Sequence, residues 1–209
     1  MAGSDYPVPL AKAQAPHISR LEIKKSRFLA QSFHARSEKE ARAAIEELKK
    51  SHRDATHNCW AFVAGKPADT AHIGFSDDGE PSGTAGRPIL NVLLHSGIGE
   101  IALVVTRWFG GIKLGTGGLV RAYQESAAAN LGALPLGRFT PSRNARMIVP
   151  YQFIEPVKRL LATNGASVQS EKFGEYAEFE ISAPLEACAT LSAEVAAASS
   201  GAVRFEFMS

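Results

Sequence analysis

The chain has little of what marks secreted, membrane-embedded or repetitive proteins. Its 209 residues include two cysteines, Cys59 and Cys188, which are too few for the disulfide framework of a small secreted domain. No apolar run approaches the roughly 20 residues of a membrane-spanning helix, and the first residues lack the basic and apolar regions of a signal peptide. Solenoid repeats and low-complexity tracts are missing too. We therefore expect a cytoplasmic protein with reduced thiols and no membrane partner.

The chain also lacks a large excess of either positive or negative charge. Lysine and arginine number 23 and aspartate and glutamate 21, which leaves a net charge of +2. A balance this even argues against strong nonspecific DNA binding. The small basic excess lies in residues 1–140, where a local patch could follow a phosphate backbone, and an ordinary solvated face of mixed charge is the alternative. The candidate residues for this patch are Arg87, Arg107, Lys113 and Arg121.

Glycine, by contrast, is concentrated in one loop over residues 110–118. The loop follows an apolar run that predicts a buried strand over 100–106, and a helical pattern starts near Leu119. A glycine cluster at a strand-to-helix junction suits close approach of a ligand to the main chain, and a helix N-terminus favours an anion. We therefore predict a phosphate-binding loop, although a loop that merely lets helix and strand pack closely is the alternative. Its candidate ligand-binding residues are Gly110, Gly111, Lys113, Gly115, Thr116, Gly117 and Gly118.

This loop fits neither of the two common nucleotide-binding motifs. Counted from Gly110, the GxxxxGK[ST] template places Gly115 correctly but then meets Thr116 and Gly117 in place of lysine and serine or threonine. The GxGxxG template fails because the residues after Gly117 are glycine, leucine and valine. The loop therefore does not establish nucleotide binding.

A second glycine-containing loop, over residues 76–88, precedes another helical pattern. Thr84 is a suitable N-cap for that helix, and Pro88 fits its first turn because the N–H groups there have no helical partner to lose. Gly83 and Thr84 would form a second main-chain cradle for an anion. We expect this cradle and the loop over 110–118 to converge into one pocket.

Three carboxylates in the second loop, those of Asp77, Asp78 and Glu80, are of the type that binds Mg²⁺ beside a substrate phosphate. Their spacing does not match an EF-hand. The same residues can instead cap turns and pair with Arg87 or Arg107. Both interpretations remain open from the sequence.

His57 and Cys59 are two residues apart in a predicted strand, so their side chains share a face. A thiolate activated by an imidazole is a known nucleophile arrangement. A single cysteine in an apolar strand is more often a buried core residue, and no orienting group can be assigned. We keep both residues as candidate catalytic residues.

The periodicity predicts a two-domain α+β protein with an extension over residues 1–17, domains over 18–137 and 144–209, and a linker over 138–143. The first domain combines strands over 18–23, 28–34, 59–64 and 71–75 with a helix that begins at a capping box of Ser37 and Glu40. We expect its helices on one face of the sheet. The second domain has the order βαββαβ of a ferredoxin-like plait.

The chain resembles the IMPACT/YigZ family. The resemblance rests on residues 107–123, on residues 77–88 and on the segment from His57 to Trp60, which occur in the family's order over about seventy residues. The family commonly has tyrosine where this chain has Trp108, and both are large aromatic side chains that can stack.

The resemblance implies a cytosolic two-domain protein. In the family, the first domain is similar to the second domain of a small-subunit ribosomal protein, and the second domain of bacterial members is similar to the fifth domain of elongation factor G. Eukaryotic members oppose activation of an initiation-factor kinase with an additional N-terminal domain. Only about seventeen residues precede the first predicted strand here, so we do not carry that role over. Binding linked to nucleic acid or the ribosome is the usual suggestion for bacterial members.

Two hypotheses of function follow. The preferred one is a noncatalytic binding protein that acts on RNA, the ribosome or a translation factor, with Trp108 as a stacking surface beside the anion-binding loops. The alternative is an enzyme that acts on a phosphate ester or nucleotide, with Mg²⁺ held by the acidic loop and with Lys113 and Arg107 stabilising the phosphoryl charge.

Overall fold

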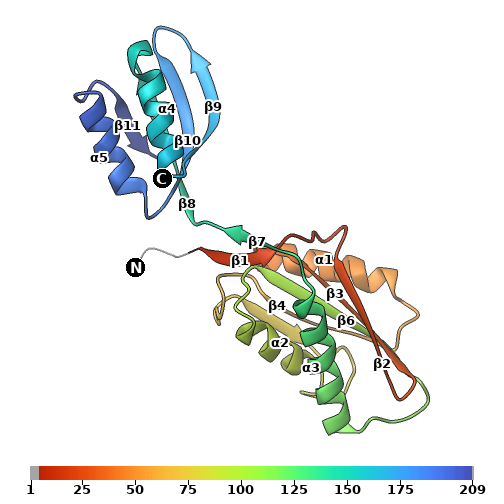
Figure 1. Ribbon diagram of the computed structural model, residues 1–209. Coiled ribbons are helices and arrows are strands. Elements are labelled where there is room, and N and C mark those ends of the chain that lie inside the picture. The colour runs from red at the N-terminus through yellow and green to blue at the C-terminus, as the bar shows by residue number, and fades with distance from the viewer. Residues whose placement is uncertain (1–4, 209) are drawn as a thin grey trace. The chain divides into compact units, whose positions relative to one another are not determined.

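The structure is a computed structural model that describes residues 5–208, and it divides into two compact α+β units (Figure 1). The first unit spans Tyr6–Phe139, and the second comprises residues 140–208, with which Asp5 is grouped. The predicted two-domain α+β organisation is thus present.

The boundaries of the first unit differ from the prediction at both ends. Strand β1 (Tyr6–Pro9), within the predicted extension over 1–17, pairs antiparallel with strand β7 (Leu136–Phe139). The rings of Tyr6 and Phe139 lie 5.0 Å apart in this two-stranded ribbon. The predicted linker is also mostly strand, because only residues 140 and 141 separate β7 from the first strand of the second unit. Pairing between segments so distant in sequence leaves no local signal.

A five-stranded antiparallel sheet forms the centre of the first unit. Its strands are β2 (His17–Ile23), β3 (Ser26–His34), β4 (His57–Val63), β5 (Ile73–Ser76) and β6 (Ile101–Trp108). They lie in the order β2-β3-β6-β4-β5. Strand β6 is buried over nearly its whole length because it lies in the middle of the sheet.

Helices cover both faces of this sheet, so the prediction that they lie on one face is wrong. The helices are α1 (Glu38–Ser51), α2 (Gly86–His95) and α3 (Thr116–Gly132). Helix α1 packs on the face that carries Phe33 and Phe62, whereas α2 and α3 pack on the opposite face, which carries Phe28 and Cys59 (Figure 1). Because side chains alternate along a strand, consecutive residues of β6 face different layers.

The two predicted helix caps have different outcomes. The Ser37 side chain accepts a hydrogen bond from the Glu40 N–H at the start of α1, which confirms Ser37 as the N-cap. The Glu40 side chain accepts from the Arg36 N–H, one residue before the cap, and not from the Ser37 N–H as in a complete capping box. The prediction of Thr84 as the N-cap of α2 is wrong. The N-cap is Ala85, and the Thr84 hydroxyl instead donates to the Pro81 carbonyl.

The second unit has the predicted βαββαβ order. Its elements are β8 (Ser142–Val149), a short 3₁₀ turn (Tyr151–Phe153), α4 (Ile154–Thr163), β9 (Ser167–Phe173), β10 (Ala177–Pro184), α5 (Cys188–Ala198) and β11 (Arg204–Phe207). The antiparallel strand order β11-β8-β10-β9 is that of a ferredoxin-like plait. No helix in residues 5–208 combines the length and apolar character needed to cross a membrane.

Candidate functional site

A cavity of about 330 Å³ in the first unit brings the two predicted loops together. Glu80 and Pro81 come from the acidic loop, and Lys113 to Thr116 come from the glycine-rich loop. The remaining lining residues come from β4, β6 and α3 and their flanking segments: Thr56, His57, Arg107, Phe109 and Leu119. The segments around Glu80 and Gly115 therefore lie on the same side of the sheet, as expected.

A buried ion pair forms the floor of this cavity. The Arg107 guanidinium donates through Nη1 to Oε1 of Glu80 over 2.7 Å, and the side chains are 6% and 3% exposed. The hydroxyl of Tyr123, a fully buried residue of α3, donates to the same Glu80 oxygen over 2.8 Å. A carboxylate taken out of water needs such donors. Glu80 is therefore tied to β6 and α3 at once.

Arg107 has further contacts and one unused donor. Its Nη2 donates to the Ser26 hydroxyl over 3.3 Å, and its guanidinium lies over the rings of Phe28 and Phe109 at 5.6 Å from each centroid. Its Nε is buried, and no acceptor for it lies among the residues that the structure describes. A buried N–H without an acceptor is costly, so a ligand or water that accepted this hydrogen bond would be favoured.

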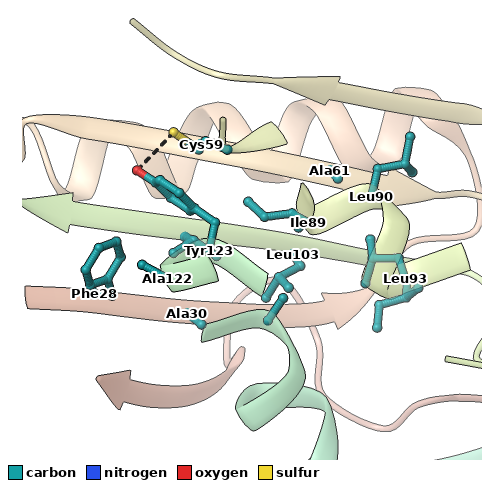
Figure 2. Close-up of a cluster of buried hydrophobic side chains, with 14 of the residues drawn as sticks. Phe28, Ala30, Cys59, Ala61, Ile89, Leu90, Leu93, Leu103, Ala122 and Tyr123 are labelled. Atoms are coloured by element: carbon teal, nitrogen blue, oxygen red, sulfur yellow. Dashed lines mark hydrogen bonds between the residues drawn. The ribbon is translucent and has the colours of Figure 1, made fainter. Parts of the chain in front are cut away.

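His57 and Cys59 share a face of β4, but they do not form a nucleophile pair. The single S–H of Cys59 can donate to the Asp77 carbonyl, 2.9 Å from Sγ, or to the Tyr123 hydroxyl, 3.3 Å from Sγ; Figure 2 shows the second contact. Burial raises the pKa of the Cys59 thiol, and burial likewise raises the pKa of Tyr123. The reactive thiolate is therefore disfavoured, and Cys59 belongs to the core, as the alternative interpretation held.

The His57 ring faces the cavity and the acidic loop. Its Nδ1 lies 2.9 Å from the Asp78 carbonyl oxygen, which can only accept, so Nδ1 carries the proton. Its Nε2 lies 3.8 Å from Oε2 of Glu80. This ring nitrogen is therefore the one available to a ligand in the cavity.

The three carboxylates of the acidic loop point to separate partners. Asp77 accepts from the N–H groups of Gly83, Ala85 and Gly86, and so caps the N-terminus of α2. Asp78 pairs with Lys49 over 2.9 Å and accepts from the Asn58 N–H over 2.7 Å. The hydrogen bond to Asp78 raises the pKa of Lys49.

These contacts answer the two sequence interpretations of the acidic loop. No cluster of three or more metal-binding side chains is found in the described part of the chain, and Asp77, Asp78 and Glu80 do not share a site. The second cradle is likewise used within the protein, because the Gly83 N–H donates to Asp77 and the Thr84 N–H donates to the Pro81 carbonyl. The interpretation as turn caps and ion pairs describes this loop, with Lys49 and Arg107 as the cations.

The N-terminus of α3, by contrast, is open. The N–H groups of Thr116, Gly117 and Gly118 find no acceptor within residues 5–208, and Gly115, the N-cap, has no side chain to supply one. Lys113 beside them is exposed, and within the same residues no carboxylate pairs with it. This end of the helix carries a partial positive charge and lies at the same cavity as Arg107.

The glycines of this loop have two different roles. A Cβ at Gly110 would lie 2.0 Å from the backbone of Lys25, so this glycine lets the loop pack against the β2–β3 turn. At Gly115, where φ is +73°, and at Gly117 a Cβ would meet nothing within 4 Å. The packing interpretation therefore fits Gly110 but leaves the helix end without such an explanation.

Trp108 lies on the opposite face of the sheet from Arg107, so the predicted patch that joins them is wrong. Arg27 of β3 lies directly opposite Trp108 of β6, and its guanidinium is 5.2 Å from the centroid of the indole ring. The indole N–H of Trp108 donates to Asp54 over 2.8 Å. Period-two alternation along β6 separates the two side chains, a signal already present in the sequence. Arg87 and Arg121 are exposed on α2 and α3, and neither is among the described residues that line the cavity.

Two contributors to the site were missed. Tyr123 is not among the site residues predicted above, although a buried phenol needs a hydrogen-bond partner and so indicates a buried acceptor. Ser26, the first residue of β3, accepts hydrogen bonds from the Gly110 N–H and from Arg107 Nη2, a role for which the sequence carries no signal.

Comparisons with known proteins cover both units. A family model described as "Impact N-terminal domain" matches residues 24–131, and a second, described as "Domain of unknown function (DUF1949)", matches residues 147–202. The chain is 39% identical to "IMPACT family member YigZ" of Escherichia coli strain K12 over 88% of its own length and 90% of that protein's. It is also 39% identical to "IMPACT family member YvyE" of Bacillus subtilis strain 168, over 76% and 72% of the two chains.

A solved structure agrees with this similarity. It is described as "Crystal structure of an hypothetical protein", shares 36% of its residues with this chain and superimposes with a TM-score of 0.71. The match covers 99% of this chain and 98% of the other.

Proposed function

This chain belongs to the IMPACT family, and from that premise we propose that it is a noncatalytic protein that binds RNA of the translation machinery. The phosphate of the RNA is held in the cavity between the acidic loop and the N-terminus of α3. The expected cytoplasmic location is part of this proposal, as are the expected similarities of the two units to a ribosomal-protein domain and to a domain of elongation factor G.

The open end of α3 is the observation that carries the proposal. Lys113, Thr116 and Arg107 line one cavity. Within residues 5–208, the first N–H groups of α3 and the buried Arg107 Nε have no acceptor, and the Lys113 ammonium has no carboxylate partner. A helix N-terminus with a nearby cation is a favourable place for a phosphate. The Glu80 carboxylate cancels most of the Arg107 charge, so Lys113 and the helix end provide the net attraction.

The arrangement of the carboxylates disfavours the metal-dependent alternative. An ion at this cavity would need Asp77 and Asp78 to leave the α2 N-terminus and Lys49, and Glu80 to leave Arg107 and Tyr123. Each exchange would uncover buried or capped donors. Under that alternative, Asp78→Asn would abolish a Mg²⁺-dependent turnover, whereas under our proposal it leaves RNA binding unchanged in a folded protein.

Binding of a single-stranded RNA, titrated with salt, tests the proposal. Lys113→Ala should weaken binding several-fold and lower the slope of log K against log salt by about 0.7, the value for one phosphate contact on a single strand. Lys39→Ala, which removes an exposed charge from α1 on the other side of the sheet, is the matched control. Equal affinity and equal slope for the two variants would refute the proposal.

A further inference from the structure

The cavity beside α3 is shaped for one anion with an apolar group attached to it. Its side walls are largely apolar, from Phe109, Leu114, Leu119 and Pro81. Phe109 is 47% exposed at this site although it is a large hydrophobic residue. Such a wall can pack against a ribose or a base, but it offers nothing to a second phosphate.

The charges of the cavity lead to the same conclusion. Arg107 and Lys113 are the cations among the described lining residues, and Arg107 is already paired with Glu80. Because Glu80 lies on the floor, a second anion placed deeper would meet a buried carboxylate. The attraction is therefore limited to one site, at Lys113 and the α3 N-terminus.

The donors at that site favour the phosphate with the larger charge and the greater number of free oxygens. Thr116, Gly117 and Gly118 supply three N–H groups that have no acceptor within residues 5–208, and Lys113 supplies an ammonium. A phosphodiester within a chain has two free oxygens and one negative charge. A terminal phosphate monoester has three free oxygens and a charge of about −1.5 to −2 at pH 7, so it can accept from more of these donors.

We infer that this cavity recognises a terminal phosphate monoester on a nucleotide, in preference to the phosphodiesters inside an RNA strand. The inference rests on the proposed function, and it names the chemical group that the site selects. The phosphate occupies the end of α3, and the attached ribose or base packs on Phe109 and Leu114. The terminal nucleotide of an RNA and a free nucleoside monophosphate share this chemistry.

Four probes test the inference on the full chain. They are one RNA decamer with a 5′-phosphate, the same decamer with a 3′-phosphate, the same decamer with hydroxyls at both ends, and a nucleoside monophosphate as competitor. We expect a phosphorylated end to bind about tenfold more tightly than the hydroxyl decamer, as suits added charge-assisted hydrogen bonds. Lys113→Ala should remove most of that preference, whereas Lys39→Ala should keep it.

The outcomes separate this inference from the proposed function. Equal binding of all three decamers, with Lys113→Ala weakening each equally, would overturn the inference and leave the proposed function standing. If none of the three decamers bound, both the inference and the proposed function would be overturned. If the nucleoside monophosphate competed as strongly as a decamer with a phosphorylated end, the result would support the inference. It would also show that the terminal nucleotide alone is sufficient for binding. Lys113 is exposed, so its variant should fold, and tryptophan fluorescence checks this.

Discussion

Breaking the buried Glu80–Arg107 pair should destabilise the first unit measurably. We consider Glu80→Gln, which keeps the size of the side chain and one acceptor oxygen but removes the negative charge. In the native protein, one oxygen of Glu80 accepts from both Arg107 and Tyr123. The amide of the variant cannot neutralise the guanidinium, which stays buried, and its NH₂ group needs a new acceptor.

The magnitude follows from burial. Removing one partner of a buried ion pair typically costs about 3–5 kcal/mol, because the remaining charge is left uncompensated. Because the amide oxygen of the variant can still accept a hydrogen bond, the cost of Glu80→Gln should lie near the lower end of this range, at about 3 kcal/mol. This is a large fraction of the roughly 5–15 kcal/mol by which a domain is stable. Glu47→Gln breaks the exposed Glu47–Lys50 pair of α1 and should cost less than about 1 kcal/mol.

Tryptophan fluorescence during urea unfolding measures the two costs. Both tryptophans of the chain, Trp60 and Trp108, lie in the first unit, so the signal reports the unfolding of that unit. The free energy of unfolding of Glu80→Gln should fall well below that of Glu47→Gln, with similar slopes against urea. If the two variants differ by less than about 0.5 kcal/mol, a difference within ordinary surface effects, the reasoning about the buried pair is wrong.

Three further predictions concern the caps, the thiols and pH. Asp77→Ala should destabilise the first unit by about 1–2 kcal/mol in the same urea assay, because it removes the cap of α2. Cys59 and Cys188 should resist alkylation in the native protein and react after unfolding, because burial raises the pKa of both thiols; rapid native labelling of Cys59 would contradict its core position. The hydrogen bond that the His72 ring donates to Asp69 raises the pKa of His72 and lowers the pKa of Asp69, so an NMR titration should find the pKa of His72 above that of an ordinary histidine, with Asp69→Asn reversing the shift. The stability from this pair is complete between the ordinary pKa values of aspartate and histidine; it is lost as pH rises through the raised pKa of His72 and as pH falls through the lowered pKa of Asp69.

Local patterns were sufficient where an element's neighbours in sequence are also its neighbours in space. The N-cap Ser37 accepts from the Glu40 N–H within one helical turn, and this half of the capping box was predicted correctly. The βαββαβ order of the second unit was also readable, because each strand alternates and each helix carries an apolar stripe.

Long-range contacts could not be read in the same way. Strand β1 contains Pro7 and Pro9, which count against a strand, and it forms only because β7 offers a partner at the far end of the unit. The helices were placed on one face because amphipathic stripes do not say which face they cover. Phe33 and Phe62 on one side and Phe28 on the other show that both faces of the sheet are apolar.

The candidate site was partly predictable for a similar reason. The residue types that suit an anion were found from composition and spacing, but their partners depend on the fold. Asp77 has the same chemistry as an external anion at a helix N-terminus, and it occupies the end of α2. Nothing in the sequence distinguishes a loop that supplies its own carboxylate from one that leaves the position open.

This difference between the two helix ends explains why the chain has two similar loops with two different roles. At α2 the protein supplies the anion itself through Asp77, so that end stabilises the fold and has no donors to offer. At α3 the N-cap is Gly115, which has no side chain to compete with a ligand. Gly115 has φ +73° and ψ 164°, a backbone conformation that is essentially restricted to glycine, so a serine or aspartate could not cap α3 from this position. The backbone at Gly115 therefore leaves the first N–H groups of α3 without an acceptor among the described residues, beside the exposed Lys113.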